Sequence, residues 1–193
     1  PRGQDTAERT ALIALGANVD SRVGAPADTL RAALHEVERG LGTVTGKSRL
    51  WRTPAFPPGS GPDYVNAAAA VVTELWAEQV LAALHSIEAA FGRVRVERWG
   101  ARGIDLDLLA LGDEVCPDAA TQTLWRDLAP DAQRQTAPRD LILPHPRMQD
   151  RAFVLAPLAE VAPDWRHPVT GRTVAEMFAA LPPDAVAEIT PLS

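Results

Sequence analysis

The order in which strand-like and helix-like patterns follow one another limits the folds open to this chain. Short runs of apolar and β-forming residues predict strands, and apolar residues that recur every three to four positions predict helices. Six segments carry such patterns, in this order: a strand at 10–16, a helix at 30–41, strands at 43–53 and 64–75, a helix at 80–91 and a strand at 104–111. The order βαββαβ predicts an α+β, ferredoxin-like core, with an antiparallel sheet and two helices on one face. Short helices within 153–161 and 173–181 are expected to follow.

Composition narrows the class of protein further. The 193 residues carry a formal net charge of −6, which argues against a broad nucleic-acid-binding surface. No run of 18 apolar residues predicts a membrane span, and the N-terminal residues lack the pattern of a signal peptide. Cys116 is the single cysteine, so a reduced, cytoplasmic setting is expected. We expect a flexible tail at 1–9 and one domain at 10–193, monomeric and without nucleic-acid or membrane partners, interrupted by an insertion at about 117–138.

Two carboxylates interrupt the last apolar strand, IDLDLLAL. Side chains two apart on a strand share a face, so Asp105 and Asp107 are expected to lie together, with Cα atoms about 6.6 Å apart. Two carboxylates on one face repel each other unless a cation lies between them. Mg²⁺ fits such a pair, because it prefers oxygen ligands and completes its shell with phosphate and water. The alternative is a pair of solvated acids on the open face of the sheet.

Four arginines lead into this strand: Arg93, Arg95, Arg98 and Arg102. The guanidinium fork matches phosphate oxygens, so an arginine cluster beside an aspartate pair indicates an anionic ligand held between metal and arginine. The alternative is an exposed basic turn whose arginines pair with surface acids.

Other residues are candidates for ligand recognition, and each has a structural alternative. His145 lies between two prolines, where a lone histidine is either structural or functional, and Glu88 lies on a predicted helix, where an exposed glutamate is ordinary. Side chains around the loop at 54–63 would read the edge of a flat heterocycle or only form the turn, and aromatic residues would stack on its face or belong to the core. These candidates are Thr53, Pro54, Tyr64 and Asn66 for the edge, and Phe56, Trp99 and Phe153 for the face.

Longer stretches resemble one enzyme family in sequence and order. They are GAN at 16–18, WRTPAF at 51–56, PDYVNAA at 62–68, IEAAFGRVRVERWGARGIDLDLL at 87–109 and LPHPRMQDRAFVLAPLAEVAP at 143–163. The family is 6-hydroxymethyl-7,8-dihydropterin pyrophosphokinase of folate biosynthesis. The resemblance implies a ferredoxin-like fold and transfer of pyrophosphate from ATP to the hydroxymethyl group of the dihydropterin, with release of AMP. ATP and the dihydropterin would be the small-molecule partners.

The resemblance also implies roles for individual residues. Asp105 and Asp107 would hold two Mg²⁺ ions against the ATP phosphates, and Arg93 and Arg102 would be catalytic arginines on loops that close over the triphosphate. The remaining nucleotide contacts would be Glu88, Arg95, Leu108, His145 and Arg151. The pterin pocket would consist of Thr53, Pro54, Phe56, Tyr64, Asn66 and Phe153, with Trp99 in its lid.

Three departures from the family pattern stand out. Ala17 replaces a serine and so removes any hydroxyl contact there, and Asp140 stands where some relatives carry an arginine. The segment at 117–138 is longer than the usual connection. We expect its apolar residues Leu124, Trp125 and Leu128 to dock on the domain, with its Asp and Gln residues outward. The alternative is a loose insertion that the domain tolerates. A non-catalytic module that binds nucleotide or RNA is the alternative function, and both the Asp pair and the net charge oppose RNA.

Overall fold

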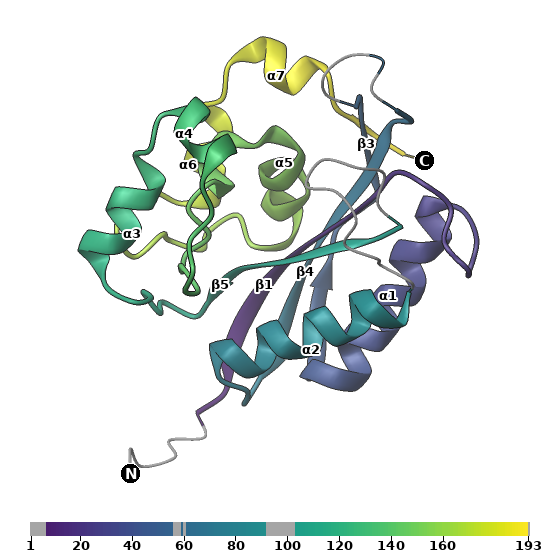
Figure 1. Ribbon diagram of the computed structural model, residues 1–193, viewed down its shortest axis with the longest axis horizontal. Helices are drawn as coiled ribbons and strands as arrows, with labels where there is room; N and C mark the ends of the chain where they lie inside the picture. Colours follow the sequence, from purple (N-terminus) through teal and green to yellow (C-terminus); the bar gives the residue numbers. More distant parts are fainter. Residues whose placement is uncertain (1–6, 56–58, 60, 92–102, 193) are drawn as a thin grey trace.

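The predicted element order recurs in the structure. The computed structural model describes residues 7–55, 59, 61–91 and 103–192 (Figure 1). The core elements are β1 (Arg9–Ala17), α1 (Pro26–Leu41), β2 (Thr43–Lys47), β3 (Trp51–Thr53), β4 (Tyr64–Thr73), α2 (Ala77–Ala90) and β5 (Asp105–Leu111). The later elements are α3 (Ala119–Arg126), α4 (Pro130–Gln135), a 3₁₀ turn η1 (Met148–Asp150), α5 (Ala152–Val161), α6 (Val174–Ala179), α7 (Pro183–Ala187) and β6 (Thr190–Pro191).

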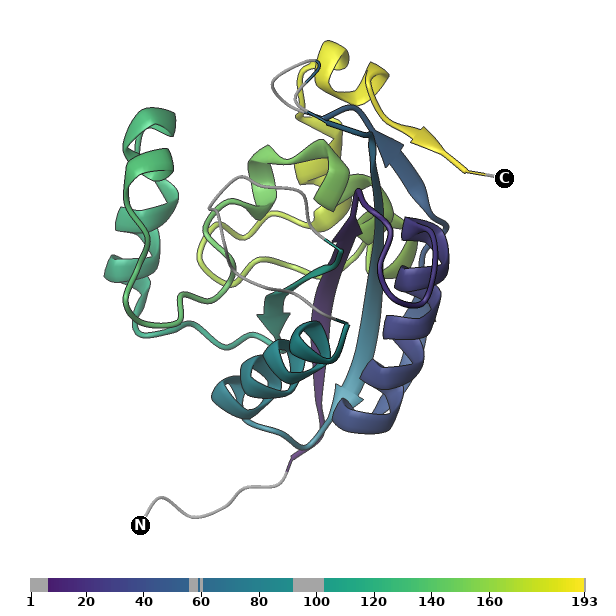
Figure 2. The same ribbon diagram turned by 45° about the vertical axis from the view of Figure 1, so that its right-hand side comes forward.

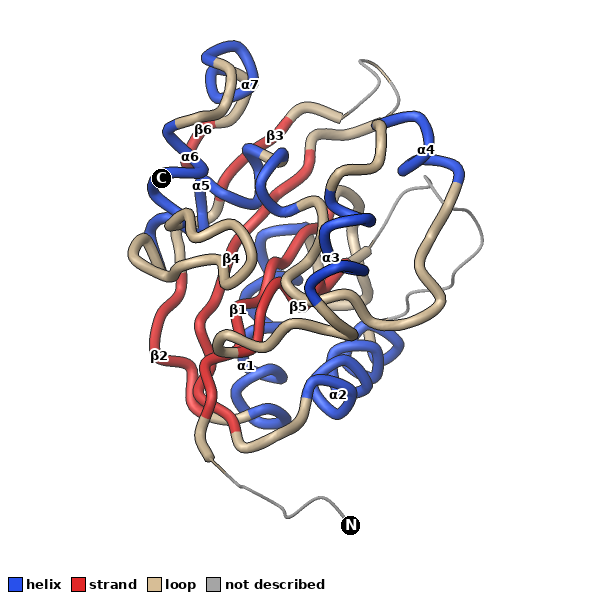
Figure 3. The backbone as a smooth tube through the Cα atoms, turned by 90° about the vertical axis from the view of Figure 1, so that its left-hand side faces the viewer, coloured by secondary structure: helices blue, strands red, loops and turns tan. Residues whose placement is uncertain are grey.

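The strands form one antiparallel sheet in the order β5-β1-β4-β3-β6, with β2 also paired to β4. Figure 3 shows β2, β4, β1 and β5 lying side by side. The two long helices connect β1 to β2 and β4 to β5, so each crosses from one strand to the next over the sheet. This is the ferredoxin-like arrangement that the element order predicted.

The helices α1 and α2 cover one face of the sheet. The predicted periodicity holds, because Leu30, Ala33 and Val37 of α1 are fully buried at helical spacing. They pack against the strand residues that point to the same side, among them Ile13 and Leu15 of β1. Burying one such side chain contributes roughly 1.5–3 kcal/mol, so this layer supplies much of the driving force for folding.

The C-terminal helices cover part of the opposite face of the sheet, a position that the sequence analysis did not predict. Leu12 of β1 points to this side and packs with Leu155 and Leu158 of α5. Ala68 and Ala70 of β4 lie in the same cluster, and their small side chains let α5 lie close to the sheet. The result is three layers, and Figure 2 shows α5 on the side of the sheet away from α1.

The segment 43–53, expected as one strand, is two. Thr43 pairs with Val72, whereas Trp51 pairs with Asn66, so the register shifts on the way from β2 to β3. Ser48 bridges the break: its amide donates to the Ala68 carbonyl at 2.9 Å, and its hydroxyl accepts the Ala68 amide at 2.9 Å. A side-chain oxygen thus replaces one backbone acceptor of the ladder, which lets the strand bend without losing a hydrogen bond.

The inserted segment docks in a way that contradicts the sequence-based expectation. Leu124 is 66% exposed, and Trp125 and Leu128 are half-buried, whereas Gln122, expected to face outward, is fully buried. The Gln122 amide nitrogen donates to the Pro144 carbonyl at 3.1 Å, and its amide oxygen accepts from Arg126 at 3.4 Å. A buried amide costs little when both of its ends are hydrogen-bonded, so a glutamine rather than a leucine anchors α3.

The N-terminal strand begins close to the start of the described residues. β1 begins at Arg9, whose guanidinium lies 3.9 Å from the centre of the Trp76 ring, and residues 1–6 of the expected tail lie outside the described residues. Within the described residues, every helix is too short or too polar to cross a bilayer.

Candidate active site

One row of residues crosses the sheet on the face away from α1 and α2. Asp105 of β5 pairs with Gly16 of β1, and Gly16 pairs with Asn66 of β4. Residues directly opposite each other in an antiparallel ladder share a face, so Asp105 and Asn66 point to the same side. Neighbouring strands are about 4.8 Å apart, which puts these two Cα atoms about 10 Å apart across the glycine.

The aspartate pair lies as the alternation predicted. Asp105 and Asp107 are both half-buried, whereas Ile104, Leu106 and Leu108 are buried on the helix side. Asp107 pairs with Ala14, so the two carboxylates lie beside a glycine and an alanine rather than beside bulky side chains. Small neighbours leave room above the strand for a ligand.

Glu88 of α2 holds this strand from the helix side. Its carboxylate is 2% exposed, and its Oε1 accepts the Leu106 amide at 2.8 Å. Among the described strands β5 lies at the sheet edge, where outward amides lack a strand partner. Glu88 satisfies the amide that lies between Asp105 and Asp107, so α2 fixes the backbone that carries the pair.

A second polar group lies at the other end of the row. The Asn66 side chain is buried, and its Nδ2 donates to the Thr53 hydroxyl at 2.8 Å. Thr53 pairs with Tyr64, which puts all three on one face. A Cβ on Gly16 would lie 3.0 Å from the Asn66 Oδ1, so the absence of a side chain at Gly16 leaves space for that amide oxygen.

His145 is fixed to β5 by its own backbone. Its amide donates to the Leu109 carbonyl at 2.8 Å, and its Nδ1 accepts the Arg147 amide at 3.1 Å. Burial, aided by the nearby charges of Arg151 and Arg147, lowers the pKa of His145 to about 3. The imidazole is therefore neutral at physiological pH, and because Nδ1 accepts, Nε2 carries the proton.

The thiol of Cys116 offers no nucleophile. Burial, together with its hydrogen bond to the Glu114 carboxylate, raises the pKa of Cys116 to about 12, so the thiol is protonated at neutral pH. The described residues also hold no group of three or more His, Cys, Asp or Glu side chains that would enclose a metal.

Sequence comparison identifies the family. Residues 12–163 match the model of 7,8-dihydro-6-hydroxymethylpterin-pyrophosphokinase (HPPK). The chain belongs to the HPPK family. Proteins named 2-amino-4-hydroxy-6-hydroxymethyldihydropteridine pyrophosphokinase are similar to it throughout. The one from Synechocystis is 35% identical over 94% of this chain and 80% of its own, and the one from Methylorubrum extorquens is 36% identical over 93% and 98%.

Solved structures of HPPK-DHPS chains have the same fold. The wild-type HPPK-DHPS of Plasmodium falciparum matches with a TM-score of 0.64 and 16% identity, over 90% of this chain and 44% of that chain. This chain thus spans less than half of that longer protein, and the match supports the fold. The family match confirms the predicted enzyme class, and the structural match confirms the predicted ferredoxin-like core.

The strand pairing brings five of the described HPPK candidates to one sheet face: Asp105, Asp107, Asn66, Thr53 and Tyr64. The side chains of Glu88 and Leu108 lie on the helix side, buried at 2% and 4% exposure, so neither side chain shares the face of the aspartate pair. Ala17 is buried in the same helix-side core. Pro54 is exposed beside Thr53, and Arg151 stacks at 5.6 Å on the half-exposed ring of Phe153 at the start of α5.

Five predicted residues lie outside the described residues, and their roles stay predictions: Phe56, Arg93, Arg95, Trp99 and Arg102.

The structure also reveals a residue to which the sequence analysis assigned no role, Asn18. The Asn18 side chain is 5% exposed and donates to the Pro62 carbonyl at 3.3 Å, which ties the loop after β1 to the loop before β4. An asparagine beside a glycine and an alanine was the signal available in the sequence.

Proposed function

We propose that this chain transfers pyrophosphate from ATP to the hydroxymethyl group of 6-hydroxymethyl-7,8-dihydropterin, giving the pterin diphosphate and AMP. Membership of the HPPK family supports the reaction. The observation that carries the proposal is the row Asp105–Gly16–Asn66 on one sheet face. It places the strand position of a carboxylate for the metal-bound triphosphate and that of an amide for the heterocycle about 10 Å apart between Cα atoms, a span that suits two substrates lying end to end.

The aspartate pair fits magnesium. Asp105 and Asp107 offer two carboxylates on one face with small neighbours, and two protein carboxylates suffice because Mg²⁺ takes its other ligands from phosphate and water. We propose two ions here. When bound, Mg²⁺ supplies neutralisation of the charge on the transferring phosphates. The protein itself holds both carboxylates in place, through the strand β5 and through the hydrogen bond of Glu88 to that strand.

The amide of Asn66 suits one edge of the pterin. One N–H of its Nδ2 is donated to Thr53, and this bond fixes the amide so that its Oδ1, above Gly16, is offered to a ring N–H. The Thr53 hydroxyl accepts from Asn66 and keeps its own proton to donate to a ring nitrogen or oxygen. Tyr64 and Phe153 would provide ring contacts, together with Pro54, Phe56 and the lid residue Trp99.

His145 and the arginines would bind the nucleotide. The neutral His145 presents an N–H at Nε2, which can donate to a phosphate oxygen. Arg151 would add positive charge, and the catalytic arginines Arg93 and Arg102, with Arg95, would close over the triphosphate. Phosphoryl-type transfer has a loose transition state, so positioning and charge neutralisation account for catalysis without a protein nucleophile.

An assay of AMP release tests the proposal. The purified protein with ATP, the dihydropterin and Mg²⁺ should release AMP, and removing either the pterin or Mg²⁺ should abolish release. Asp105→Asn and Asp107→Asn should each lower kcat/KM by at least ~100-fold, about 3 kcal/mol. Asp113→Asn, an exposed position just after β5, is the matched control and should behave as the parent. Near-normal turnover in either site variant would refute the metal assignment.

The last part of the proposal concerns the oligomeric state and the cellular setting of the protein. We propose a monomer in a reducing cytoplasm; the single cysteine supports the reducing setting, and the net charge of −6 argues against binding to nucleic acid. Light scattering after size-exclusion chromatography should give one chain of 20.7 kDa, and a larger mass would contradict the monomer.

A further inference from the structure

The peptide bond between Pro144 and His145 is clamped from both sides. Its N–H donates to the Leu109 carbonyl of β5 at 2.8 Å. Its carbonyl accepts from the Gln122 amide at 3.1 Å. The carbonyl and the N–H of one peptide unit lie in a common plane and point in opposite directions, so two partners fix the orientation of that plane.

The second partner comes from the insertion, which the HPPK motifs do not include. Gln122 lies in α3 and is fully buried. Its orientation is determined because its Oε1 accepts from Arg126 at 3.4 Å, which leaves Nε2 to face Pro144. Arg126 is in turn held by Asp127, with 2.9 Å between Nε and Oδ1. A chain of hydrogen bonds therefore runs from the outer side of α3 to the backbone of His145.

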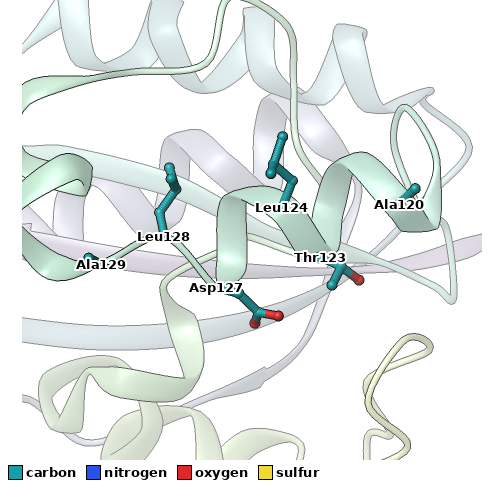
Figure 4. A pocket seen from close by; sticks show the side chains of 6 residues that line it. All are labelled: Ala120, Thr123, Leu124, Asp127, Leu128 and Ala129. Atoms are coloured by element: carbon teal, nitrogen blue, oxygen red, sulfur yellow. The ribbon is translucent and has the colours of Figure 1, made fainter.

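The outer side of α3 is open to solvent, because Leu124 is 66% exposed there. The buried contact of the helix is therefore on its inner side, where Gln122 reaches Pro144. A shallow depression of about 450 Å³ lies here. Figure 4 shows the side chains that line it: Ala120, Thr123, Leu124, Asp127, Leu128 and Ala129. Gln122 and Arg126, four residues apart, lie on the inner side of the same helix. Gln122 is the fully buried residue of α3, and its side chain contacts the loop of His145, whereas Trp125 and Leu128 are only half-buried.

We infer that Gln122 is a positioning residue for the reaction: it fixes the Pro144–His145 peptide, and thereby aims the His145 imidazole at the nucleotide. This inference rests on the proposed function, which makes His145 a nucleotide contact. The insertion is then part of the nucleotide site by way of the backbone, without contacting ATP. Loss of the Gln122 hydrogen bond lets the peptide plane rotate, which misaligns Nδ1 of His145 from the Arg147 amide.

The first test is kinetic. Gln122→Met keeps the length of the side chain and removes the donor, so KM for MgATP should rise roughly fivefold while kcat and KM for the pterin stay within twofold. Asp118→Ala is the matched control, because it removes the N-cap bond to Thr121 but leaves Gln122 in place. It should weaken α3 without changing KM for MgATP. An equal rise in both variants would show that only helix stability matters, and would overturn the inference.

A second variant covers the case in which Gln122→Met displaces the helix. Gln122→Glu keeps an acceptor for Arg126 but cannot donate to Pro144 while ionised, so it should raise KM for MgATP as well. In ¹H–¹⁵N spectra of the imidazoles, the parent should show His145 with its proton on Nε2, and both Gln122 variants should show a mixture of proton positions. Unchanged spectra and unchanged KM in both variants would refute the role of Gln122.

A double-variant cycle separates this inference from the proposed function. His145→Ala should raise KM for MgATP by about tenfold or more, and adding Gln122→Met should cause no further rise, because Gln122 acts through His145. If His145→Ala has no effect, the nucleotide role of His145 is wrong and the inference falls with it. If His145→Ala acts but Gln122→Met adds fully to it, the proposed function stands and the positioning role is refuted.

Discussion

The Glu88 carboxylate accepts the Leu106 amide at 2.8 Å, and Leu106 lies between the two aspartates of β5. A residue that the family resemblance associates with the nucleotide therefore holds the backbone of β5 in this structure. Because Glu88 is 2% exposed, losing its carboxylate would leave a buried amide without its acceptor. The strand that presents Asp105 and Asp107 depends on this contact for its place.

Glu88→Ala should lower both stability and turnover. The unsatisfied Leu106 amide should cost about 1–3 kcal/mol of unfolding free energy, measured by urea denaturation. Glu88→Gln keeps an oxygen acceptor and should recover most of that loss. Glu78→Ala, on the exposed first turn of the same helix, should cost below about 1 kcal/mol. A Glu88→Ala variant as stable as the Glu78→Ala control would show that the hydrogen bond contributes nothing.

Gly16→Ala should weaken pterin binding. The new Cβ would lie 3.0 Å from the Asn66 Oδ1, and relieving such a contact by moving the amide costs about 1–3 kcal/mol. We expect KM for the pterin to rise roughly tenfold. Gly40→Ala is the control: nothing lies within 4 Å of its Cβ, and alanine in the helix should stabilise the fold by about 0.5–1 kcal/mol. Unchanged pterin kinetics in Gly16→Ala would argue against the Asn66 pocket.

Stability should fall in mild acid because of His167. Burial, with a contribution from the charge of Arg126, lowers its pKa from 6.5 to about 4. Between these values the unfolded chain binds a proton that the folded chain does not, so stability is full above pH 6.5 and falls as the pH drops toward 4. The loss should be on the order of 3 kcal/mol.

The slope of stability against pH checks this assignment. His167→Asn keeps an acceptor for the amides of Val169 and Thr170, which the Nδ1 of His167 now accepts, and it removes the titrating group. Between pH 6.5 and 4, the number of protons taken up on unfolding should be lower by about one in the variant, whatever its absolute stability. The remaining dependence should include His145, whose pKa is lowered to about 3. A parent-like slope in the variant would exclude His167 as its source.

Replacing 119–136 by a short Gly/Ser link should leave the chemistry nearly intact. Cys116 and Leu143 exchange two backbone hydrogen bonds of 3.0 and 3.1 Å, so the base of the segment is already closed. We expect kcat within roughly threefold of the parent, a barrier change below ~1 kcal/mol. The melting temperature should fall, because the buried Gln122 contact is lost, and KM for MgATP should rise. A folded deletion variant without turnover would mean that the insertion takes part in the chemistry.

Local periodicity was a sound guide to this fold where one face of an element meets the core. The spacing of Leu30, Ala33 and Val37 predicted the buried stripe of α1, and the alternation around Asp105 and Asp107 predicted which side of β5 is apolar. These patterns depend only on the repeat of a helix or a strand, so they can be read from residues close together in the chain. Long family motifs added the enzyme class.

Contacts between distant segments could not be read in this way. The bend after β2 depends on Ser48 pairing with Ala68. The spacing of Leu124 and Leu128 predicted one helical side, but α3 ends at Arg126 and Leu124 is exposed. Gln122 took the inner side because both ends of its amide found partners, one of them 22 residues away at Pro144.

The chain itself therefore determined its βαββαβ core, its family and the residues that face one another along a single strand or helix. Only the tertiary structure decided that Asp105 and Asn66 lie in one row, because register between strands is set by pairing along their whole length. The tertiary structure also decided that the Glu88 carboxylate accepts a hydrogen bond from the Leu106 amide. A buried polar group is held by whichever partner the packed fold brings within hydrogen-bond distance, and that partner is not encoded in the spacing of neighbouring residues.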